Sequence, residues 1–368
     1  MLLRTGEVLV HLNKRLIIGI LFLLIVAGSF GSAGSLISYA LSPAQPGSTS
    51  SVILEVRKNA GPGELAQLLS SKGIITSPSL FVWLGRLTRQ WRRVKVGEYK
   101  LSPALNPVQV FGVITSGISV SHPLVVREGE NIYEIANELS RYALITTEKF
   151  LELCQSAGFI KTLGFPDPAP ETLEGYLFPD TYFINRTTTA EELVRKMVKR
   201  FFAVWGQKEE IRAAELRMSR QQIVTLASII EKETGAPSER PLISSVFHNR
   251  LSKRMRLQSD PTTIYGIWER YQGNLRKSDL TANTPYNTYT IPGLPKGPIS
   301  NPGKASLQAA LFPVQSEYLF FVSHNDGTHE FTKTFAEHGK AVKTFQLDRK
   351  AREGKSWRDL KKSSNSSN

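Results

Sequence analysis

The sequence predicts an α+β protein with a single N-terminal transmembrane helix, a small α+β region and a larger mixed helical domain with long loops. Three observations lead to this prediction. A long apolar stretch without charges lies near the N-terminus, and the segments after it have patterns typical of a short strand followed by a helix. The second half alternates helical periodicity with segments rich in Pro, Gly, Asn, Thr and Tyr, which favour loops on a helical scaffold. The length of 368 residues exceeds one typical domain.

The apolar stretch, residues 16–41, contains no charged side chain and is long enough to cross a bilayer. The segment before it contains three basic residues, Arg4, Lys14 and Arg15, and a single acidic residue. The positive-inside bias therefore places residues 1–15 in the cytoplasm and everything after the helix outside it. A cleaved signal peptide is the alternative, because the strongest apolar core is short and small residues follow it.

A linker and a first α+β region follow the apolar stretch. Residues 42–51 are rich in Pro, Gly and Ser, as in linkers that separate a domain from a membrane. The α+β region is expected to cover residues 52–165. Within it, Val52, Leu54 and Val56 recur at every second position, which predicts a strand, and residues 63–72 have the leucine spacing of a short helix.

A similar strand-then-helix phrase returns at residues 123–140. It resembles a LysM-type module of about residues 123–158, whose usual phrase is a short strand, a Gly-containing turn and a helix with Ile-Ala in its middle. Gly129 and the pair Ile135-Ala136 stand at those places here. A small α+β unit of another kind explains the same pattern equally well.

The larger domain is expected to span residues 166–350, and the segment 174–182 leads into it. Its regular elements are predicted as helices at 189–205, 219–234 and 240–253, a short buried strand at 319–323 and a final helix at 336–350. The polar residues 351–368 are expected to form a C-terminal tail.

The helix expected at 219–234 has clear local signals at both ends. Ser219 and Gln222 have the spacing of a capping box, and apolar residues then recur at helical spacing. Gly235 followed by Pro237 stops the helix.

Two glutamates, Glu231 and Glu233, fall in the last turn of this helix. The unsatisfied carbonyls there repel an anion, so a partly desolvated carboxylate should have a raised pKa. A raised pKa is what a general acid needs. The alternative is that both are solvated surface glutamates, and helical spacing alone does not decide which of the two matters.

The formal net charge is +14, and the basic residues are dispersed with modest groupings at 86–95, 195–200, 253–256 and 349–350. For an outward-facing protein, anionic lipid headgroups or an acidic wall polymer are better partners for this charge than nucleic acid. The single cysteine, Cys154, allows no intrachain disulfide and is expected to be buried and structural.

The sequence gives no sign of a metal or cofactor. His324, His329 and His338 fit no familiar zinc spacing, and no HExxH phrase is present. A Ser-His-Asp hydrolase is equally unsupported, because the chain has no Gly-x-Ser-x-Gly elbow. We therefore expect neither a metal site nor a cofactor.

Long ordered motifs in the larger domain carry a family resemblance. They are Ala-Ser-Ile-Ile-Glu-Lys-Glu-Thr at 227–234, Met-Arg-Leu-Gln-Ser-Asp-Pro-Thr at 255–262, Thr-Pro-Tyr-Asn-Thr-Tyr-Thr-Ile-Pro-Gly-Leu-Pro at 284–295 and Ile-Ser-Asn-Pro-Gly at 299–303. On these motifs the chain resembles the YceG-like family, the membrane-anchored endolytic murein transglycosylases often called MltG, over nearly its whole length. The resemblance implies that residues 166–350 form the catalytic domain. It also implies a bacterial inner (plasma) membrane location, with this domain in the periplasm or outside the cell.

In that family the catalytic acid is the second glutamate of the Glu-x-Glu-Thr phrase, which corresponds to Glu233. The resemblance implies cleavage of the β-1,4 bond between N-acetylmuramic acid and N-acetylglucosamine in peptidoglycan strands, with a 1,6-anhydro end as product. The substrate's own C6 hydroxyl is then the nucleophile, so one carboxyl group can act first as acid and then as base. Glu231, Asp260 and Glu239 are the candidates for a second carboxylate, and the sequence does not choose among them.

A sugar cleft needs amides and hydroxyls for N-acetyl groups and flat rings for pyranose faces. The residues expected to bind substrate are Gln258, Asp260, Thr262, Tyr286, Asn287 and Tyr289. In this interpretation Gln258 and Asn287 bind N-acetyl or hydroxyl groups, and Tyr286 or Tyr289 orients the acid. Asp260 could instead cap a helix, and Tyr289 could belong to the core.

A rival function from another class is a non-catalytic membrane tether that binds peptidoglycan and organises cell-wall synthases. Binding without cleavage would need the same aromatic and amide cleft, but it would not need Glu233. In either case the expected partners are glycan strands, the membrane and penicillin-binding synthases, and no nucleic acid.

Overall fold

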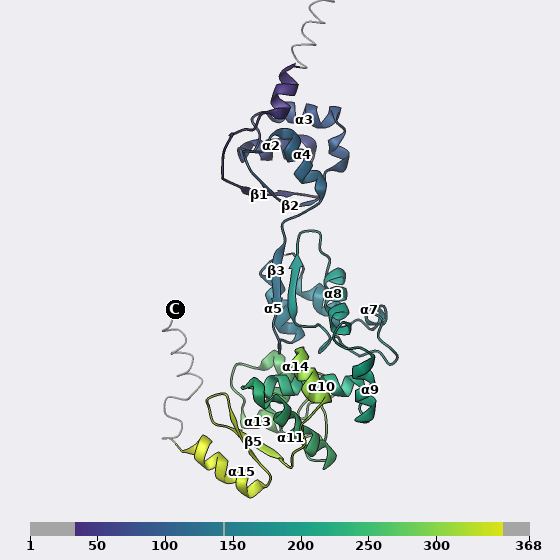
Figure 1. Cartoon of the computed structure of the whole chain (residues 1–368), viewed down its shortest axis with the longest axis vertical. Helices are drawn as coiled ribbons and strands as arrows, with labels where there is room; N and C mark the ends of the chain where they lie inside the picture. Colours follow the sequence, from purple (N-terminus) through teal and green to yellow (C-terminus); the bar gives the residue numbers. More distant parts are fainter. Residues whose placement is uncertain (1–33, 143, 349–368) are drawn as a thin grey trace, which may run out of the picture. The chain divides into compact units, whose positions relative to one another are not determined.

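The computed structural model describes residues 34–142 and 144–348, and these divide into two compact units (Figure 1). The N-terminal unit contains residues 34–121 together with 185–187, and the C-terminal unit contains the rest. Within the described residues no helix is both long and apolar enough to cross a membrane. Most of the predicted transmembrane helix 16–41, the cytoplasmic segment 1–15 and the tail 351–368 lie outside the described residues.

The N-terminal unit is a two-stranded sheet covered by three helices and a 3₁₀ turn. The antiparallel strands β1 (Val52–Val56) and β2 (Gly97–Leu101) pair with Leu54 opposite Tyr99. The helical elements are α2 (Pro62–Ser71), α3 (Pro78–Leu87), η1 (Gln90–Arg93) and α4 (Pro107–Ser116). The strand predicted at 52–56 is confirmed, and so is the helix predicted at 63–72. Residues 34–41 are also helical, and Tyr39 belongs to the core of this unit.

The first part of the C-terminal unit is a second small α+β layer. The strands β3 (His122–Val126) and β4 (Asp180–Ile184) pair antiparallel, although a long stretch of chain separates them. The helices of this layer are α5 (Ile132–Ser140), α6 (Thr147–Gln155), α7 (Ala157–Lys161) and α8 (Ala190–Phe202). The strand-then-helix phrase expected at 123–140 is confirmed as β3 and α5. Cys154, which belongs to α6, is buried and unpaired, as predicted.

The remainder of the C-terminal unit is helical and surrounds α10 (Arg220–Glu233), which packs against α9, α11, α12 and α14. The other elements are α9 (Gln207–Glu215), η2 (Pro237–Glu239), α11 (Arg240–Ser252), α12 (Asp260–Gly266), η3 (Trp268–Arg270), α13 (Lys277–Leu280), α14 (Lys304–Leu311), β5 (Phe320–Ser323), β6 (His329–Thr332), α15 (Phe335–Val342) and η4 (Lys343–Leu347). The predictions for α8, α10, α11 and β5 are confirmed within a few residues.

One predicted element needs correction. The final helix was expected to run from 336 to 350, but α15 ends at Val342 and a wider π-helical turn, η4, follows it to Leu347. Asn325 donates a hydrogen bond to the carbonyl oxygen of Phe345, and Gln346 donates one to that of Ser323. These bonds tie η4 to the end of β5, and such a tertiary contact leaves no trace in apolar periodicity.

Candidate active site

The site is built at the C-terminal end of α10. The predicted capping box is present, because the Ser219 hydroxyl accepts from the backbone N–H of Gln222 and the Gln222 side chain accepts from that of Ser219. Eight consecutive residues from Ile223 to Ile230 are buried, so the helix is fixed on all sides. At its other end Thr234 adopts an extended conformation and stops the helix directly after Glu233. A rigid element therefore delivers this carboxyl group to a defined place.

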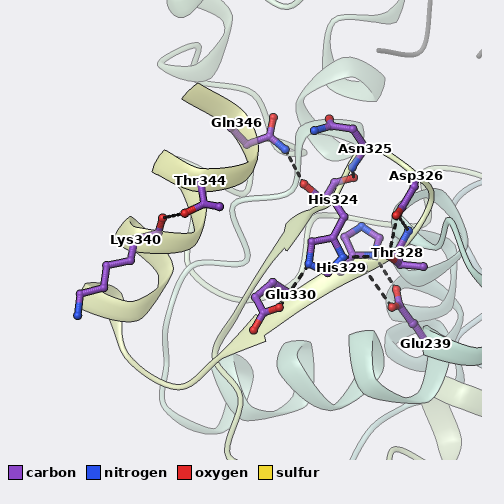
Figure 2. A network of polar contacts seen from close by, with 11 residues as sticks. Glu239, His324, Asn325, Asp326, Thr328, His329, Glu330, Lys340, Thr344 and Gln346 are labelled. Carbon is purple, nitrogen blue, oxygen red and sulfur yellow. Dashed lines mark hydrogen bonds and ion pairs between the residues drawn. The ribbon is translucent and has the colours of Figure 1, made fainter. Parts of the chain in front are cut away.

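The turn between β5 and β6 lies against the end of α10. Gly235 approaches the carbonyl of Gly327 so closely that a Cβ atom would not fit there. Figure 2 shows a second link, in which Glu239 accepts hydrogen bonds from the backbone N–H of His329 (3.1 Å) and from its Nδ1 (2.8 Å). The hairpin is thus held at two points beside Glu233, and it carries Phe320 and Phe321 into the site.

The Ser259 hydroxyl donates a hydrogen bond of 2.6 Å to Glu233 Oε1. Ser259 is only 2% exposed and precedes α12. Its own backbone N–H donates to the Thr288 hydroxyl at 3.0 Å, and Thr262 donates to the Ser259 carbonyl at 2.6 Å. This chain of buried hydroxyl groups fixes the hydroxyl of Ser259 in front of the carboxyl group.

A cavity of about 340 Å³ opens in front of Glu233. Its wall combines polar groups with aromatic rings and consists of Glu233, Phe247, Arg250, Leu257, Gln258, Asp260, Tyr289, Phe320, Phe321, Phe335 and His338. Phe335 is 76% exposed, so one aromatic face at the rim is open to a ligand. Flat rings beside amide and carboxyl groups form a surface that suits a sugar.

The pKa of Glu233 is raised to about 7, and the largest cause is burial of its carboxyl group. The nearby Asp260 raises it further, whereas the hydrogen bond from Ser259 and the charge of Arg250 act in the opposite direction. The predicted direction is therefore confirmed for Glu233. The main cause is desolvation, in place of the helix-end carbonyls on which the prediction was based.

Arg250 supplies a positive charge at the same wall. It is 8% exposed, and its guanidinium donates to the backbone carbonyls of Leu319 (2.6 Å) and Leu257 (2.8 Å) while lying over the ring of Phe320. Because carbonyls hold the guanidinium in place, its charge remains available to the ionised form of Glu233.

The two glutamates of the last turn differ sharply in their surroundings. Glu231 accepts a hydrogen bond from the backbone N–H of Gly303 (2.9 Å) and pairs with Arg240 (3.6 Å). Its side chain is 8% exposed and does not line the cavity. Glu231 therefore ties α10 to the start of α14, and only Glu233 of the pair faces the cavity.

Three of the predicted substrate-binding residues, Gln258, Asp260 and Tyr289, line the cavity with Glu233. Asp260 accepts a hydrogen bond of 2.7 Å from the Tyr289 hydroxyl. Gln258 adopts a positive φ of 48°, which is uncommon for a residue with a side chain. Such strained backbone is found disproportionately at functional sites, where the surrounding structure enforces it.

The other three predicted residues do not face the cavity. Thr262 and Asn287 are 0% exposed. The Asn287 side-chain nitrogen donates to the backbone carbonyls of residues 279, 280 and 282, and its oxygen accepts from the Thr263 hydroxyl. The geometry gives these two residues the role of fixing the 258–289 loops. Tyr286 packs against Tyr265 at 4.8 Å and lines separate cavities.

Of the three candidates for a second carboxylate, only Asp260 shares the cavity with Glu233. Sequence reasoning missed Ser259, Arg250 and His338. Ser259 could have been found, since it stands between two chosen residues. No local signal marks His338, whose Nδ1 is buried without a hydrogen-bond partner beside the cavity. In the described part of the chain, no group of three or more His, Cys, Asp or Glu side chains could hold a metal ion.

Comparison with known proteins shows the family of this chain. The model of the YceG-like family matches residues 54–344. A protein named endolytic murein transglycosylase from Bacillus subtilis (strain 168) is 31% identical, over 88% of this chain and 91% of its own length. One of the same name from Streptococcus pneumoniae (strain ATCC BAA-255 / R6) is 26% identical, over 88% of this chain and 63% of its own length.

A solved structure, described as a yceG-like protein from Listeria monocytogenes, superimposes with a TM-score of 0.55 and 32% sequence identity. The match covers 80% of this chain and 99% of the other. The family model spans well over half of the sequence and includes every residue of the cavity around Glu233. This chain is therefore a member of the YceG-like family.

Proposed function

We propose that this chain is an endolytic murein transglycosylase that cleaves the β-1,4 bond between N-acetylmuramic acid and N-acetylglucosamine within peptidoglycan strands. The observation that carries the proposal is a carboxyl group with a pKa raised to about 7, held by Ser259 at the wall of a cavity lined with aromatic and amide groups. The shared name of the relatives supports the same reaction.

In the proposed mechanism the protonated Glu233 donates its hydrogen to the bridging glycosidic oxygen. The bond between that oxygen and C1 of N-acetylmuramic acid breaks, and positive charge develops at C1. The C6 hydroxyl of the same sugar then adds to C1, and its proton passes to the carboxylate of Glu233. The acid is thereby regenerated, and no water is consumed. A single carboxyl group suffices because the nucleophile belongs to the substrate and is already close to C1.

The other groups at the cavity support these steps. Arg250 stabilises the Glu233 carboxylate between the two proton transfers, and Ser259 keeps the carboxyl oxygen oriented. Asp260 carries negative charge beside the developing positive charge at C1, and Tyr289 holds it in place. Gln258 and the unpartnered Nδ1 of His338 are the groups assigned to the N-acetyl and hydroxyl substituents.

The wider organisation follows from the same proposal. We assign residues 16–41 as a membrane-spanning anchor, residues 42–51 as a linker, and residues 52–165 as an α+β region with a LysM-like module near 123–158. Residues 166–350 are assigned as the catalytic domain. A membrane-anchored enzyme of this kind would end glycan elongation close to the membrane, where penicillin-binding synthases are its candidate partners.

The products distinguish the proposed reaction from its alternatives. We expect the purified full-length chain to release fragments with 1,6-anhydro-N-acetylmuramic acid ends from sacculi, which mass spectrometry identifies because they are lighter than hydrolysed ends by one water. Reducing ends alone would make the protein a hydrolase. Binding to sacculi with no released fragment would favour the non-catalytic tether.

The pH dependence of cleavage should report on Glu233. Its acid form predominates below a pKa of about 7, so kcat/KM is expected to fall as the pH rises through that value. Ser259→Ala removes a hydrogen bond that favours the ionised form of Glu233, and it should therefore move the fall in kcat/KM to higher pH. Ser259→Thr keeps a hydroxyl and serves as the matched control. If kcat/KM of Ser259→Ala falls at the same pH as that of the wild type, the titration does not belong to Glu233.

A further inference from the structure

The N-terminal unit exposes apolar and basic side chains together on α3 and η1. Trp83 is 57% exposed and Leu87 is 64% exposed, one helical turn apart on the same face of α3. The basic segment 86–95 contains five Arg or Lys residues and no acidic residue. We call Trp83, Arg86, Leu87, Arg89, Arg92 and Arg93, all of which are exposed, the α3–η1 surface.

The packing of this region fixes which side faces outward. Phe81 and Leu84 of α3 are buried in the core, and the Trp91 indole donates a hydrogen bond of 3.1 Å to the carbonyl of Val82. Gly85 makes room for that indole, since a Cβ atom there would collide with it. With Trp91 facing inward, η1 is fixed beside α3 and its arginines Arg92 and Arg93 remain in solvent.

The described part of the chain does not neutralise the charges of the α3–η1 surface. None of the ion pairs formed within residues 34–142 and 144–348 includes any of its four arginines. The guanidinium of Arg86 lies 6.0 Å from the centre of the Trp83 ring, so a cation and an exposed aromatic ring share one place on the surface.

This surface also lies close to where the chain enters the unit. The Tyr39 hydroxyl donates a hydrogen bond of 2.8 Å to the carbonyl of Ser77, the N-cap residue of α3. Figure 1 shows α3 and the first described helical turns at one end of the N-terminal unit, with β1 and β2 at the other. Tyr39, in the described end of the uncharged stretch, thus contacts the N-terminal end of the helix that carries the exposed tryptophan.

We propose that the α3–η1 surface docks on the anionic headgroup layer of a bilayer. In this arrangement the arginines contact lipid phosphates, while Trp83 and Leu87 enter the boundary between headgroups and acyl chains. Amphipathic tryptophan and long basic side chains are the groups that this boundary accommodates. An acidic wall polymer would also attract the arginines, but it would offer no apolar layer for the two exposed apolar side chains. The inference does not depend on the cleavage reaction.

The test uses the full chain in nanodiscs of phosphatidylcholine, with or without phosphatidylglycerol, that carry brominated acyl chains. The Trp83→Phe variant, compared with the wild type, isolates the fluorescence of Trp83 from that of the other tryptophans. We expect bromine to quench the Trp83 signal in the anionic discs, and high salt to reduce this quenching because it screens the arginines. The Trp83→Phe variant should retain the wild-type melting temperature, because Trp83 is an exposed side chain.

The charge contribution is tested with two double variants that each remove two positive charges. Arg92→Gln with Arg93→Gln should lower the ratio of docked to undocked protein roughly 30-fold, since each basic residue near an anionic surface contributes about 1 kcal/mol. Arg57→Gln with Lys58→Gln, exposed residues directly after β1, should leave the ratio unchanged. The proposal is overturned if the two pairs behave alike, or if Trp83 is unquenched in anionic discs. It is also overturned if soluble poly(glycerol phosphate) binds through Arg92 and Arg93 while Trp83 stays unquenched.

Discussion

Replacing Glu233 by glutamine is expected to lower the rate of anhydro-end formation by roughly 100- to 10,000-fold, the range that a lost general acid and base accounts for. The amide keeps the size of the side chain and can still accept the hydrogen bond from Ser259, but it cannot transfer a proton to the glycosidic oxygen. Kinetic measurement of anhydro ends released from sacculi checks this. Binding of the variant to insoluble wall should be largely retained.

Stability measurements separate this loss of chemistry from a loss of fold. The pKa of Glu233 is raised from 4.5 to about 7 in the folded protein. The unfolded chain therefore ionises first as the pH rises, and the wild type loses stability between these two values. Glutamine does not titrate, so the Glu233→Gln variant should melt at or above the wild-type temperature at neutral pH. A lower melting temperature would indicate that the side chain is mainly structural.

The neighbouring glutamate provides the matched control. Glu231→Gln can still accept from the Gly303 N–H but loses the charge that pairs with Arg240. We expect a lower melting temperature with kcat close to that of the wild type in the folded fraction. If this variant loses kcat while remaining folded and Glu233→Gln retains it, the assignment of the acid is wrong.

The largest expected effect on stability is that of Glu174→Ala. Glu174 is 0% exposed and accepts hydrogen bonds from the Ile132 backbone N–H (3.1 Å), the Tyr265 hydroxyl (2.9 Å) and Asn301 Nδ2 (3.1 Å). These donors come from α5, α12 and the loop before α14, so one carboxyl group joins both parts of the C-terminal unit. The Ile132 N–H and the Tyr265 hydroxyl would be left without a partner, and Asn301 Nδ2 would keep only the Glu130 carbonyl, which should cost about 3 kcal/mol or more of unfolding free energy. Denaturant or thermal unfolding measures this.

Glu174→Gln is the conservative counterpart and has its own pH signature. Burial is the largest cause that raises the pKa of Glu174 from 4.5 to about 8. Its contribution to stability is complete below pH 4.5 and is lost as the pH rises towards 8, because only the unfolded chain ionises in that interval. Between pH 7 and 8, above the pKa of Glu233, the wild type should still lose stability while Glu174→Gln should not. Parallel melting curves for the two proteins across that interval would contradict the account.

The sequence predicted the parts of this protein that depend on local interactions. The capping box at Ser219, the apolar run of α10 and the end of the helix shortly before Gly235 follow from neighbouring residues, so both the helix and the glutamates at its end could be predicted. The long motifs were sufficient to indicate the family. The strands β4 and β6 were not predicted, because each is defined by a partner and by burial more than by its own short sequence.

Only the tertiary structure decided which of the two glutamates faces the cavity, because the distinction rests on Ser259, 26 positions along the chain, and on Gly303, which holds Glu231. The same holds for the substrate-binding set, in which α12 and the loops beside it turn Gln258, Asp260 and Tyr289 towards the cavity and Thr262, Tyr286 and Asn287 away from it. The sequence determined by itself the helix and the charges at its end. The direction in which each side chain points was decided by contacts between segments distant in the sequence, since loops have no periodicity from which it can be read.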